Sequence, residues 1–375
     1  MRWTAPLKGT APKVAVGACS LALALSGAEF ALRLSGYDPR AEALNGRVQL
    51  VRSSQTPGRG YELVPCASGT GWGTNVHVNQ YGFRGPEVFL EAPDRTRIVA
   101  LGDSVTFGNE LAYVETWPAT LERELRKAGQ SVDVLDLGLG GYDTMQEVVT
   151  LEAVGLEFRP AHVILGYCVN DLGVVSMSME TLFDDDDRAN PLYASRILQW
   201  LHVWSMERSQ TRALFERNRE ETYARAFDAE IEPLDESIAP GLAALRAAVE
   251  SAPAADDDLA TRRIPARWYA SERRLGRLQY ALGRLAALAA EHRFAVTVLL
   301  IPYLEEDRLI ERGLGLVRQL AEARGFRVVD AGDLFLADGL INLRIRESDP
   351  VHPNARGHAL LADALAAALT VGPAD

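Results

Sequence analysis

The chain is short of cysteine and of positive charge, and each shortage excludes a class of protein. Only three cysteines occur in 375 residues, at Cys19, Cys66 and Cys168, with no Cys-x-x-Cys pair and no cluster of cysteine with histidine. A disulfide-rich scaffold and a cysteine-based metal site are therefore excluded, and we expect no metal and no cofactor. The 39 basic side chains are outnumbered by 51 acidic ones, for a formal net charge of −12. Because phosphate binding needs a basic surface, we expect no nucleic-acid partner.

The overall composition is that of an ordinary globular protein. Apolar residues make up 47% of the chain and charged residues 24%, which argues against a disordered chain and against a largely membrane-embedded one. The length suffices for one large α/β domain with insertions or for two smaller domains. Cys168 lies inside an apolar run and is predicted to be a small buried side chain.

The N-terminal segment has the pattern of an export signal. Three basic residues, Arg2, Lys8 and Lys13, precede an apolar stretch over residues 14–25. The small residues Ser26-Gly27-Ala28 follow it and are typical of a cleavage site. We therefore expect the chain to be extracytoplasmic: periplasmic, secreted or tethered to the outer face of the cytoplasmic membrane.

A retained anchor is the alternative for the same segment. In that case the apolar span continues through Phe30 to Leu34, and Glu29 and Arg33 lie within it or at its outer edge. Charged side chains are costly inside a bilayer, which makes the outer edge the favourable position. Residues 1–34 are thus predicted to be a signal peptide or a membrane anchor.

From residue 97 onward, short apolar runs alternate with segments of helical periodicity. Strands are expected at residues 98–101, 132–137, 163–165, 295–301 and 327–329, and helices at 117–127, 145–156, 267–291 and 354–369. Strands separated by helices favour right-handed crossovers and a parallel sheet covered on both faces.

Two further segments fall outside this rhythm. Residues 35–95, rich in glycine and proline, are predicted to be a loop-rich β segment that leads into the domain of residues 96–375. Residues 172–265 interrupt the domain and are predicted to be a helical insertion, for which a lid or cap, a glycan groove and a partner surface are the alternatives. The acidic run 184–187 within the insertion lacks the spacing of a calcium loop and is predicted to be a solvated loop.

The first predicted strand ends at a candidate nucleophile. Gly102-Asp103-Ser104-Val105 follows the strand directly. A serine at a strand-to-helix turn presents its hydroxyl at the edge of the sheet, where its own N–H can face a developing oxyanion. A helix-capping serine or a phosphate-binding turn would also place serine here, but the further glycines and the lysine of a phosphate loop are missing.

The next two strands end in residues suited to holding an oxyanion. The second is followed by Gly138-Leu139-Gly140-Gly141, where the backbone can approach a substrate closely. The third is followed by Asn170, whose side chain can donate an N–H. A flexible turn and an Asn cap are the alternatives at these two positions.

A candidate base precedes the last predicted helix. His352 follows Asp349 by three residues in a turn bracketed by Pro350 and Pro353. Histidine suits the role because its pKa lies near neutrality, and a carboxylate on its other ring nitrogen fixes the tautomer. His358, inside the helix, is predicted to be a solvated or capping residue.

These motifs together resemble a known family. Ser104 in Gly-Asp-Ser-Val, Gly141, Asn170 and Asp349-x-x-His352 are similar to the four sequence blocks of the SGNH (GDSL) hydrolases, over residues 98–369. The resemblance implies a flavodoxin-like three-layer α/β sandwich with a five-stranded parallel sheet. It also implies that Ser104 is the nucleophile, His352 the base and Asp349 the acid that orients it. Ser104 N–H, Gly141 N–H and the Asn170 side chain would form the oxyanion hole.

The chain departs from the family pattern in places. Asp136 stands where the second block often has Asn, and Gly138 or Gly140 could replace Gly141. The motif Asn79-x-Tyr81-Gly82-Phe83-Arg84 and residues 29–33 resemble a bacterial membrane-associated subgroup.

The expected function is hydrolysis of carboxylic esters through an acyl-enzyme on Ser104. Export makes acetylated carbohydrates or lipid esters the expected substrates, whether small molecules or glycans. Two alternatives are an O-acetyltransferase acting on an exported polysaccharide and a non-catalytic surface-binding module with the same fold. The sequence predicts no particular oligomeric state.

Overall fold

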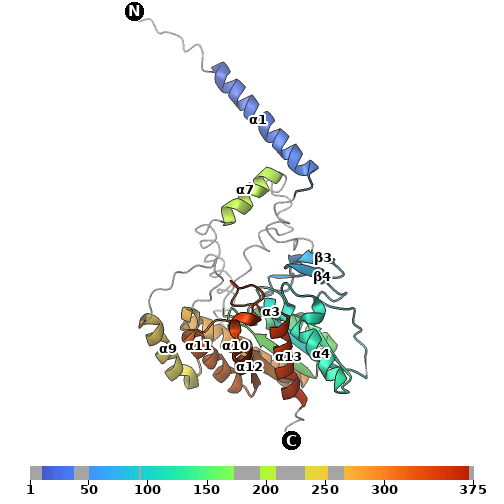
Figure 1. Cartoon of the computed structure of the whole chain (residues 1–375), viewed down its shortest axis with the longest axis vertical. Coiled ribbons are helices and arrows are strands. Elements are labelled where there is room, and N and C mark those ends of the chain that lie inside the picture. The colour runs from blue at the N-terminus through green and yellow to red at the C-terminus, as the bar shows by residue number, and fades with distance from the viewer. Residues whose placement is uncertain are drawn as a thin grey trace, which may run out of the picture.

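The computed structural model describes residues 11–37, 50–92, 94–172, 195–207, 233–251 and 266–370 (Figure 1). Most of the predicted insertion, with its acidic run 184–187, lies outside the described residues.

A five-stranded parallel sheet forms the centre of the molecule. Its spatial order is β6-β5-β7-β8-β9, and its strands are β5 (Thr96–Gly102), β6 (Val132–Asp136), β7 (His162–Tyr167), β8 (Ala295–Leu300) and β9 (Arg327–Asp330). All five predicted strands are confirmed. The inner strands are continuous apolar runs because helices cover both of their faces.

The helices form the two outer layers of the sandwich. The chain crosses from β5 to β6 through α4 (Trp117–Lys127) and returns past β5 to β7 through α5 (Thr144–Ala153). Since both crossovers are right-handed, these helices lie on opposite faces. Helix α13 (Ala355–Thr370) packs beside α4, and α10 (Glu272–His292) and α11 (Arg308–Glu322) continue the layer of α5. This is the predicted flavodoxin-like three-layer architecture.

Short elements complete the domain. They are the helices α3 (Ser104–Phe107) and α12 (Gly332–Asp338) and the 3₁₀ turns η2 (Tyr113–Glu115), η3 (Gly155–Phe158), η8 (Glu236–Ile238), η10 (Ala266–Trp268) and η11 (Leu340–Leu343). Helix α9 (Ala239–Ser251), which falls within the predicted insertion, packs on α11. Cys168 is buried after β7, as predicted.

The segment before the sheet forms two antiparallel hairpins that lie against the carboxyl end of the sheet. Strand β1 (Val51–Ser53) pairs with β2 (Tyr61–Leu63), and β3 (Ser68–Gly71) pairs with β4 (Thr74–His77). The Tyr61 hydroxyl donates to the Gly140 carbonyl at 2.5 Å, and the Tyr142 hydroxyl donates to the Tyr61 carbonyl. These buried bonds fix the hairpins to the loop that follows β6.

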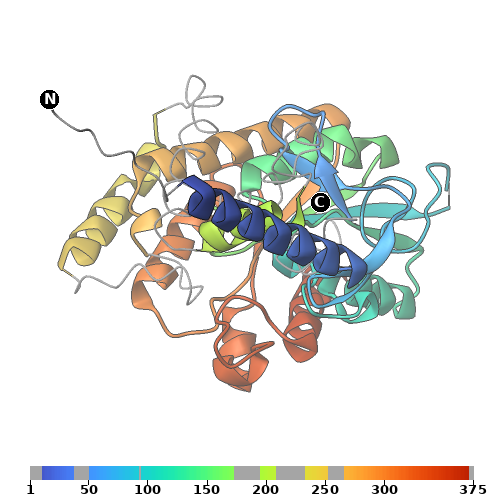
Figure 2. The ribbon, with the colours of Figure 1, turned by 90° about the horizontal axis from the view of Figure 1, so that it is seen from above.

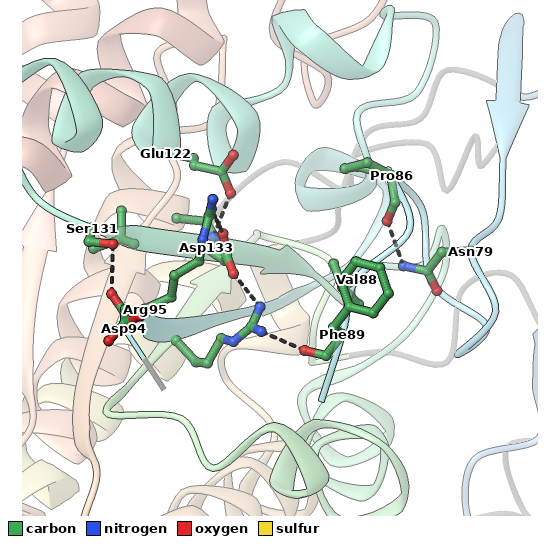
Figure 3. Close-up of polar contacts among 12 residues, drawn as sticks. Asn79, Pro86, Val88, Phe89, Asp94, Arg95, Glu122, Ser131 and Asp133 are labelled. Carbon is green, nitrogen blue, oxygen red and sulfur yellow. Dashed lines mark hydrogen bonds and ion pairs between the residues drawn. The ribbon is translucent and has the colours of Figure 1, made fainter. Parts of the chain in front are cut away.

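The connection from the hairpins into β5 is held by polar contacts (Figure 3). The Asn79 side-chain amide donates to the Pro86 carbonyl at 3.2 Å. Arg97, at the start of β5, donates to the Phe89 carbonyl at 2.6 Å and pairs with Asp133 of β6. The turn after Asn79 is thereby joined to the amino end of the sheet.

An apolar helix lies outside the sandwich. Helix α1 (Ala11–Leu34) includes the stretch Val16–Leu34, which has a mean hydropathy of 1.3 and is exposed along its length. By length and composition it could cross a membrane, although a signal sequence has the same properties. Its last turns contact α7 (Arg196–Glu207).

Candidate active site

Ser104 begins α3 shortly after β5, the second strand in the spatial order of the sheet. The Asp103 carboxylate caps this helix by accepting the N–H of Val105 at 2.8 Å. Gly102 is required just before it, because a Cβ at this position would lie 2.0 Å from the Thr106 hydroxyl oxygen. The turn therefore packs tightly, and Ser104 is only 7% exposed.

Asp349 and His352 form a compact turn of their own. One Asp349 carboxylate oxygen accepts the main-chain N–H groups of Val351 and His352 at 3.0 and 3.2 Å. The other lies 2.9 Å from His352 Nδ1. Four consecutive residues thus hold the imidazole in one orientation, with its Nε2 directed away from the carboxylate.

The fold brings this turn to Ser104. His352 Nε2 lies 2.8 Å from Ser104 Oγ, although 248 positions separate the two residues along the chain. The His352 side chain is 14% exposed, and the Asp349 side chain is buried. Serine, imidazole and carboxylate are therefore connected by hydrogen bonds, as general-base activation of a hydroxyl requires.

Asn170 is connected to Ser104 through Asp103. Its side-chain amide donates to Asp103 Oδ2 at 2.8 Å, and the Ser104 hydroxyl lies 3.0 Å from the same oxygen. An amide NH₂ carries two hydrogens, so one can hold Asp103 while the other is available to a substrate oxygen. Asp103 is thus a bridge between the nucleophile turn and the end of β7.

Sequence reasoning missed this role of Asp103. The signal was present, because an acid immediately before the first residue of a helix is a favoured cap. The hydrogen bond to the second carboxylate oxygen could not be predicted, because its donor Asn170 lies 67 positions away along the chain.

The three glycines after β6 have different surroundings. Gly138 donates its N–H to Asp136 and lies so close to α3 that a Cβ would be 2.6 Å from the Phe107 nitrogen. It is a packing position and not an available donor. At Gly140 the same added atom would be 3.6 Å from Ser104 Cβ, and Gly141 has a left-handed φ of 86°.

The main-chain N–H groups of Ser104, Gly140 and Gly141 have no acceptor within the described parts of the chain. The structure thus removes Gly138 from the candidates for the oxyanion hole. Gly140 lies near the serine, and Gly141 keeps an N–H that is bonded to no described acceptor.

Arg84, in the Asn79–Arg84 motif, braces the other end of α3. This buried guanidinium donates to the carbonyls of Phe107 and Gly108 and, at 2.7 Å, to that of Leu111. A short helix leaves its terminal carbonyls unsatisfied, and Arg84 satisfies them from a segment that precedes the sheet. The motif therefore supports the turn that carries Ser104.

Asp136 is buried beside Arg84. Burial raises the pKa of Asp136 to about 8, an effect that the charge of Arg84 and the N–H of Gly138 only partly offset. At neutral pH this carboxyl is largely protonated and therefore neutral. It then resembles the Asn that is common at this position in the family the sequence resembles.

Two further acids lie buried behind the nucleophile. Burial raises the pKa of Glu147 and of Asp171 well above the usual range. The nearby Asp103 and Asp143 raise both further, and Glu147 also raises the pKa of Asp171. Neither carboxylate oxygen of Glu147 has a hydrogen-bond partner among the described residues. These upward shifts favour the neutral form of both carboxyls, which limits the negative charge around Asp103.

His358 is separate from the site. It is buried in α13, and its Nδ1 accepts the N–H of Trp117 at 3.0 Å. It thus caps α4, one of its two predicted roles, and it is not solvated. Burial, with the nearby His352 and Arg84, lowers its pKa to about 3, so it stays neutral.

Comparison with solved structures gives distant matches. An α/β hydrolase from the metagenome of Lake Arreo, Spain, is 18% identical, with 73% of this chain and 94% of that one covered and a TM-score of 0.39. The esterase EstA from Pseudoalteromonas sp. is 12% identical, with coverages of 73% and 97% and a TM-score of 0.39. An acetylxylan esterase from Geobacillus stearothermophilus is 13% identical, with coverages of 72% and 92% and a TM-score of 0.38.

Comparison with curated proteins gave no match. The model of the GDSL-like lipase/acylhydrolase family, in contrast, matches residues 100–360. The matched stretch runs from β5 into α13 and includes the turns of Ser104 and His352. The chain therefore belongs to the GDSL-like lipase/acylhydrolase family and is a carboxylic ester hydrolase.

Proposed function

We propose that the protein hydrolyses acyl esters through a covalent acyl-enzyme on Ser104. The observation that carries this proposal is the continuous hydrogen-bonded series from Ser104 Oγ through His352 to Asp349, with links of 2.8 and 2.9 Å. Such a series activates a hydroxyl that is otherwise a poor nucleophile at neutral pH.

In the first step the Ser104 oxygen attacks the ester carbonyl carbon while His352 Nε2 takes the hydroxyl proton. Asp349 holds Nδ1 and stabilises the imidazolium electrostatically, without accepting the proton itself. The negative oxygen of the tetrahedral intermediate is held by the N–H groups of Ser104 and Gly141 and by the Asn170 amide. One such donor is typically worth about 3 kcal/mol of transition-state stabilisation.

Breakdown of the intermediate releases the alcohol, which takes the proton from His352. A water molecule, deprotonated by the same imidazole, then attacks the acyl carbonyl and regenerates Ser104. The imidazolium gives this proton to Ser104 Oγ as the bond between the acyl group and Ser104 breaks. The carboxylic acid leaves with the other hydrogen of the water and ionises in solvent, so the enzyme returns to its starting state.

We place the enzyme outside the cytoplasm because its N-terminal segment has basic residues, then an apolar stretch, then small residues, which is the order found in export signals. Esters of carbohydrates or lipids are the substrate class that we infer for this location. A tether through α1 is compatible with its exposed apolar surface.

Replacement of Ser104 tests the mechanism. Ser104→Ala should lower the turnover of a short-chain nitrophenyl ester by about 10⁴-fold or more, with an unchanged far-UV spectrum and unfolding temperature. Ser131→Ala, at the far end of the sheet, where the Ser131 hydroxyl donates to the Asp94 carbonyl (Figure 3), should keep full activity. Full turnover by the folded Ser104→Ala variant would remove this residue from the mechanism.

A further inference from the structure

Helix α1 presents an apolar surface that nothing in the described chain covers. Its 24 residues span about 36 Å, enough for the hydrocarbon core of a bilayer. The exposed apolar side chains along it include Val16, Leu21, Leu23, Phe30 and Leu34. A surface of this size on a water-soluble protein would favour aggregation, so it calls for a lipid environment.

Glu29 of α1 is bound to the start of α7. One carboxylate oxygen accepts the N–H of Arg196 at 3.0 Å, and the other accepts the N–H of Ile197 at 3.1 Å and the Ser195 hydroxyl at 2.9 Å. These bonds cap α7, and with Arg33 they lower the pKa of Glu29 to about 2. The charge in this apolar helix therefore has a specific partner in a segment about 170 positions away.

Helix α7 carries its own apolar face. Ile197, Trp200, Leu201 and Trp204 follow the i, i+3, i+4, i+7 spacing of one helical face. Trp200, Leu201 and Trp204 are 45%, 43% and 42% exposed, and the two indole rings stack with centroids 6.3 Å apart. Exposed tryptophans on an amphipathic helix are typical of the boundary between lipid headgroups and acyl chains.

The position of α7 relates this face to the active site. Helix α7 lies between α1 and the α/β domain, on the side of the domain where α3 begins (Figure 1). Seen from the α1 end, α7 lies directly beneath α1 (Figure 2). A bilayer that contains α1 would therefore meet α7 before it meets the domain, with the catalytic end of the sheet facing it.

We propose that α1 is a retained anchor and that α7 is a second membrane contact, an interfacial helix whose Trp200–Leu201–Trp204 face lies in the headgroup region of the same bilayer. The Glu29 cap fixes the angle between the two helices. Together they orient the carboxyl ends of the strands, and with them Ser104, toward the membrane surface.

The test uses the full chain, with Cys19 and Cys66 replaced by alanine, in vesicles of phosphatidylcholine and phosphatidylglycerol. An environment-sensitive NBD fluorophore is attached at Leu201→Cys or, as the control, at Leu336→Cys. Leu336 is also an exposed leucine, 55% exposed, on α12 of the α/β domain, away from α1 and α7 (Figure 1). We expect the probe at 201 to emit at shorter wavelength and to lose at least half of its intensity with spin-labelled lipids, whereas the probe at 336 is unaffected.

Three results would overturn the proposal. One is a probe at 201 that behaves like the probe at 336. Another is a blue shift at 201 without quenching by lipid, because contact with a second copy or another part of the chain would then cover α7. The third is a mature protein whose mass shows cleavage before Glu29. Turnover of the short-chain ester by the same samples reports on the proposed function separately, since neither labelled position contacts the active site.

Discussion

The turn of Ser104 and the turn of His352 meet at one catalytic centre but are built in opposite ways. The His352 turn is local, because Asp349 satisfies the next residues of its own turn and the imidazole itself. The Ser104 turn depends on distant segments: Asn170 follows β7, and Arg84 precedes the sheet. The histidine is thus positioned by its neighbours in sequence, whereas the nucleophile is positioned by the fold.

This difference predicts different consequences of substitution. Side-chain changes at His352 should affect chemistry and leave the rest of the fold intact, because the Leu304 and Ile345 N–H groups bond to main-chain carbonyls of this turn and not to the imidazole. Changes around Ser104 should affect stability and catalysis together, since the same buried contacts serve both.

The largest effect on activity is expected within the local turn. His352→Ala should lower kcat for a short-chain ester by about 10⁴-fold or more, because the serine loses its base. Asp349→Asn should cost somewhat less, since an amide oxygen can still accept the N–H groups of Val351 and His352. Both values come from steady-state kinetics.

The unfolding temperatures of these two variants should stay within a few degrees of the parent. A large drop in the unfolding temperature of either variant, together with its loss of activity, would contradict the local character of this turn.

A smaller, mixed effect is expected from the distant support of the nucleophile. Arg84→Met leaves the carbonyls of Phe107, Gly108 and Leu111 without their donor, at a cost of about 1–3 kcal/mol for each buried group. We expect lower stability and a kcat reduced by about 10-fold to 100-fold, because the end of α3 is no longer fixed.

Arg97→Met is the matched control. Arg97 is also a buried arginine, but it lies at the amino end of β5, about 20 Å from the nucleophile along the strand. This variant should be destabilised through the loss of its Asp133 and Phe89 contacts (Figure 3) yet keep its kcat. An equal loss of kcat in both variants would mean that Arg84 supports the fold in general and not the nucleophile.

The smallest effect on activity is expected at Asp136, where a substitution changes the stability of the fold in a way that depends on pH. In the unfolded chain this carboxyl ionises near pH 4, whereas in the folded chain its pKa is about 8. The folded state binds the extra proton between these values, so Asp136 lowers stability progressively from pH 4 to pH 8. Asp136→Asn, which carries no charge, should therefore gain stability over the parent as pH rises, by at most about 1.4 kcal/mol per pH unit.

Thermal unfolding at pH 5, 6, 7 and 8 measures this gain. If the variant were instead less stable at pH 8 than the parent, Asp136 and Arg84 would form a stabilising ion pair, and the support of the nucleophile would be ionic.

The same contrast explains what could be predicted from the sequence. The five strands were predictable because each is a short apolar run between polar turns, and Asp349-x-x-His352 because its geometry is contained in four residues. The bond from Asn170 to Asp103 and the bonds from Arg84 to the end of α3 could not be predicted from the sequence. No local pattern indicates which distant segment a buried donor will contact. The motif that ends in Arg84 was noticeable, but its role was not.

Helix α11 and the docking of α1 on α7 were also missed. The segment of α11 has a clear apolar face with Ile310, Leu316 and Leu320, but the sequence reading went from one strand to the next across it. The contact of Glu29 depends on a partner in α7, within a region that carries no recognisable motif. The docking of α1 on α7 thus depends on a polar contact across the fold, whereas the pattern of α11 was present in the sequence itself.

Covalent labelling tests the central claim most directly. The folded protein is treated with a fluorophosphonate probe, digested and mapped by mass spectrometry, alongside the His352→Ala variant. We predict a single modified residue, Ser104, and labelling that is much slower in the variant. Ester turnover that continues while Ser104 stays unmodified, or a probe bound to a different side chain, would contradict the account.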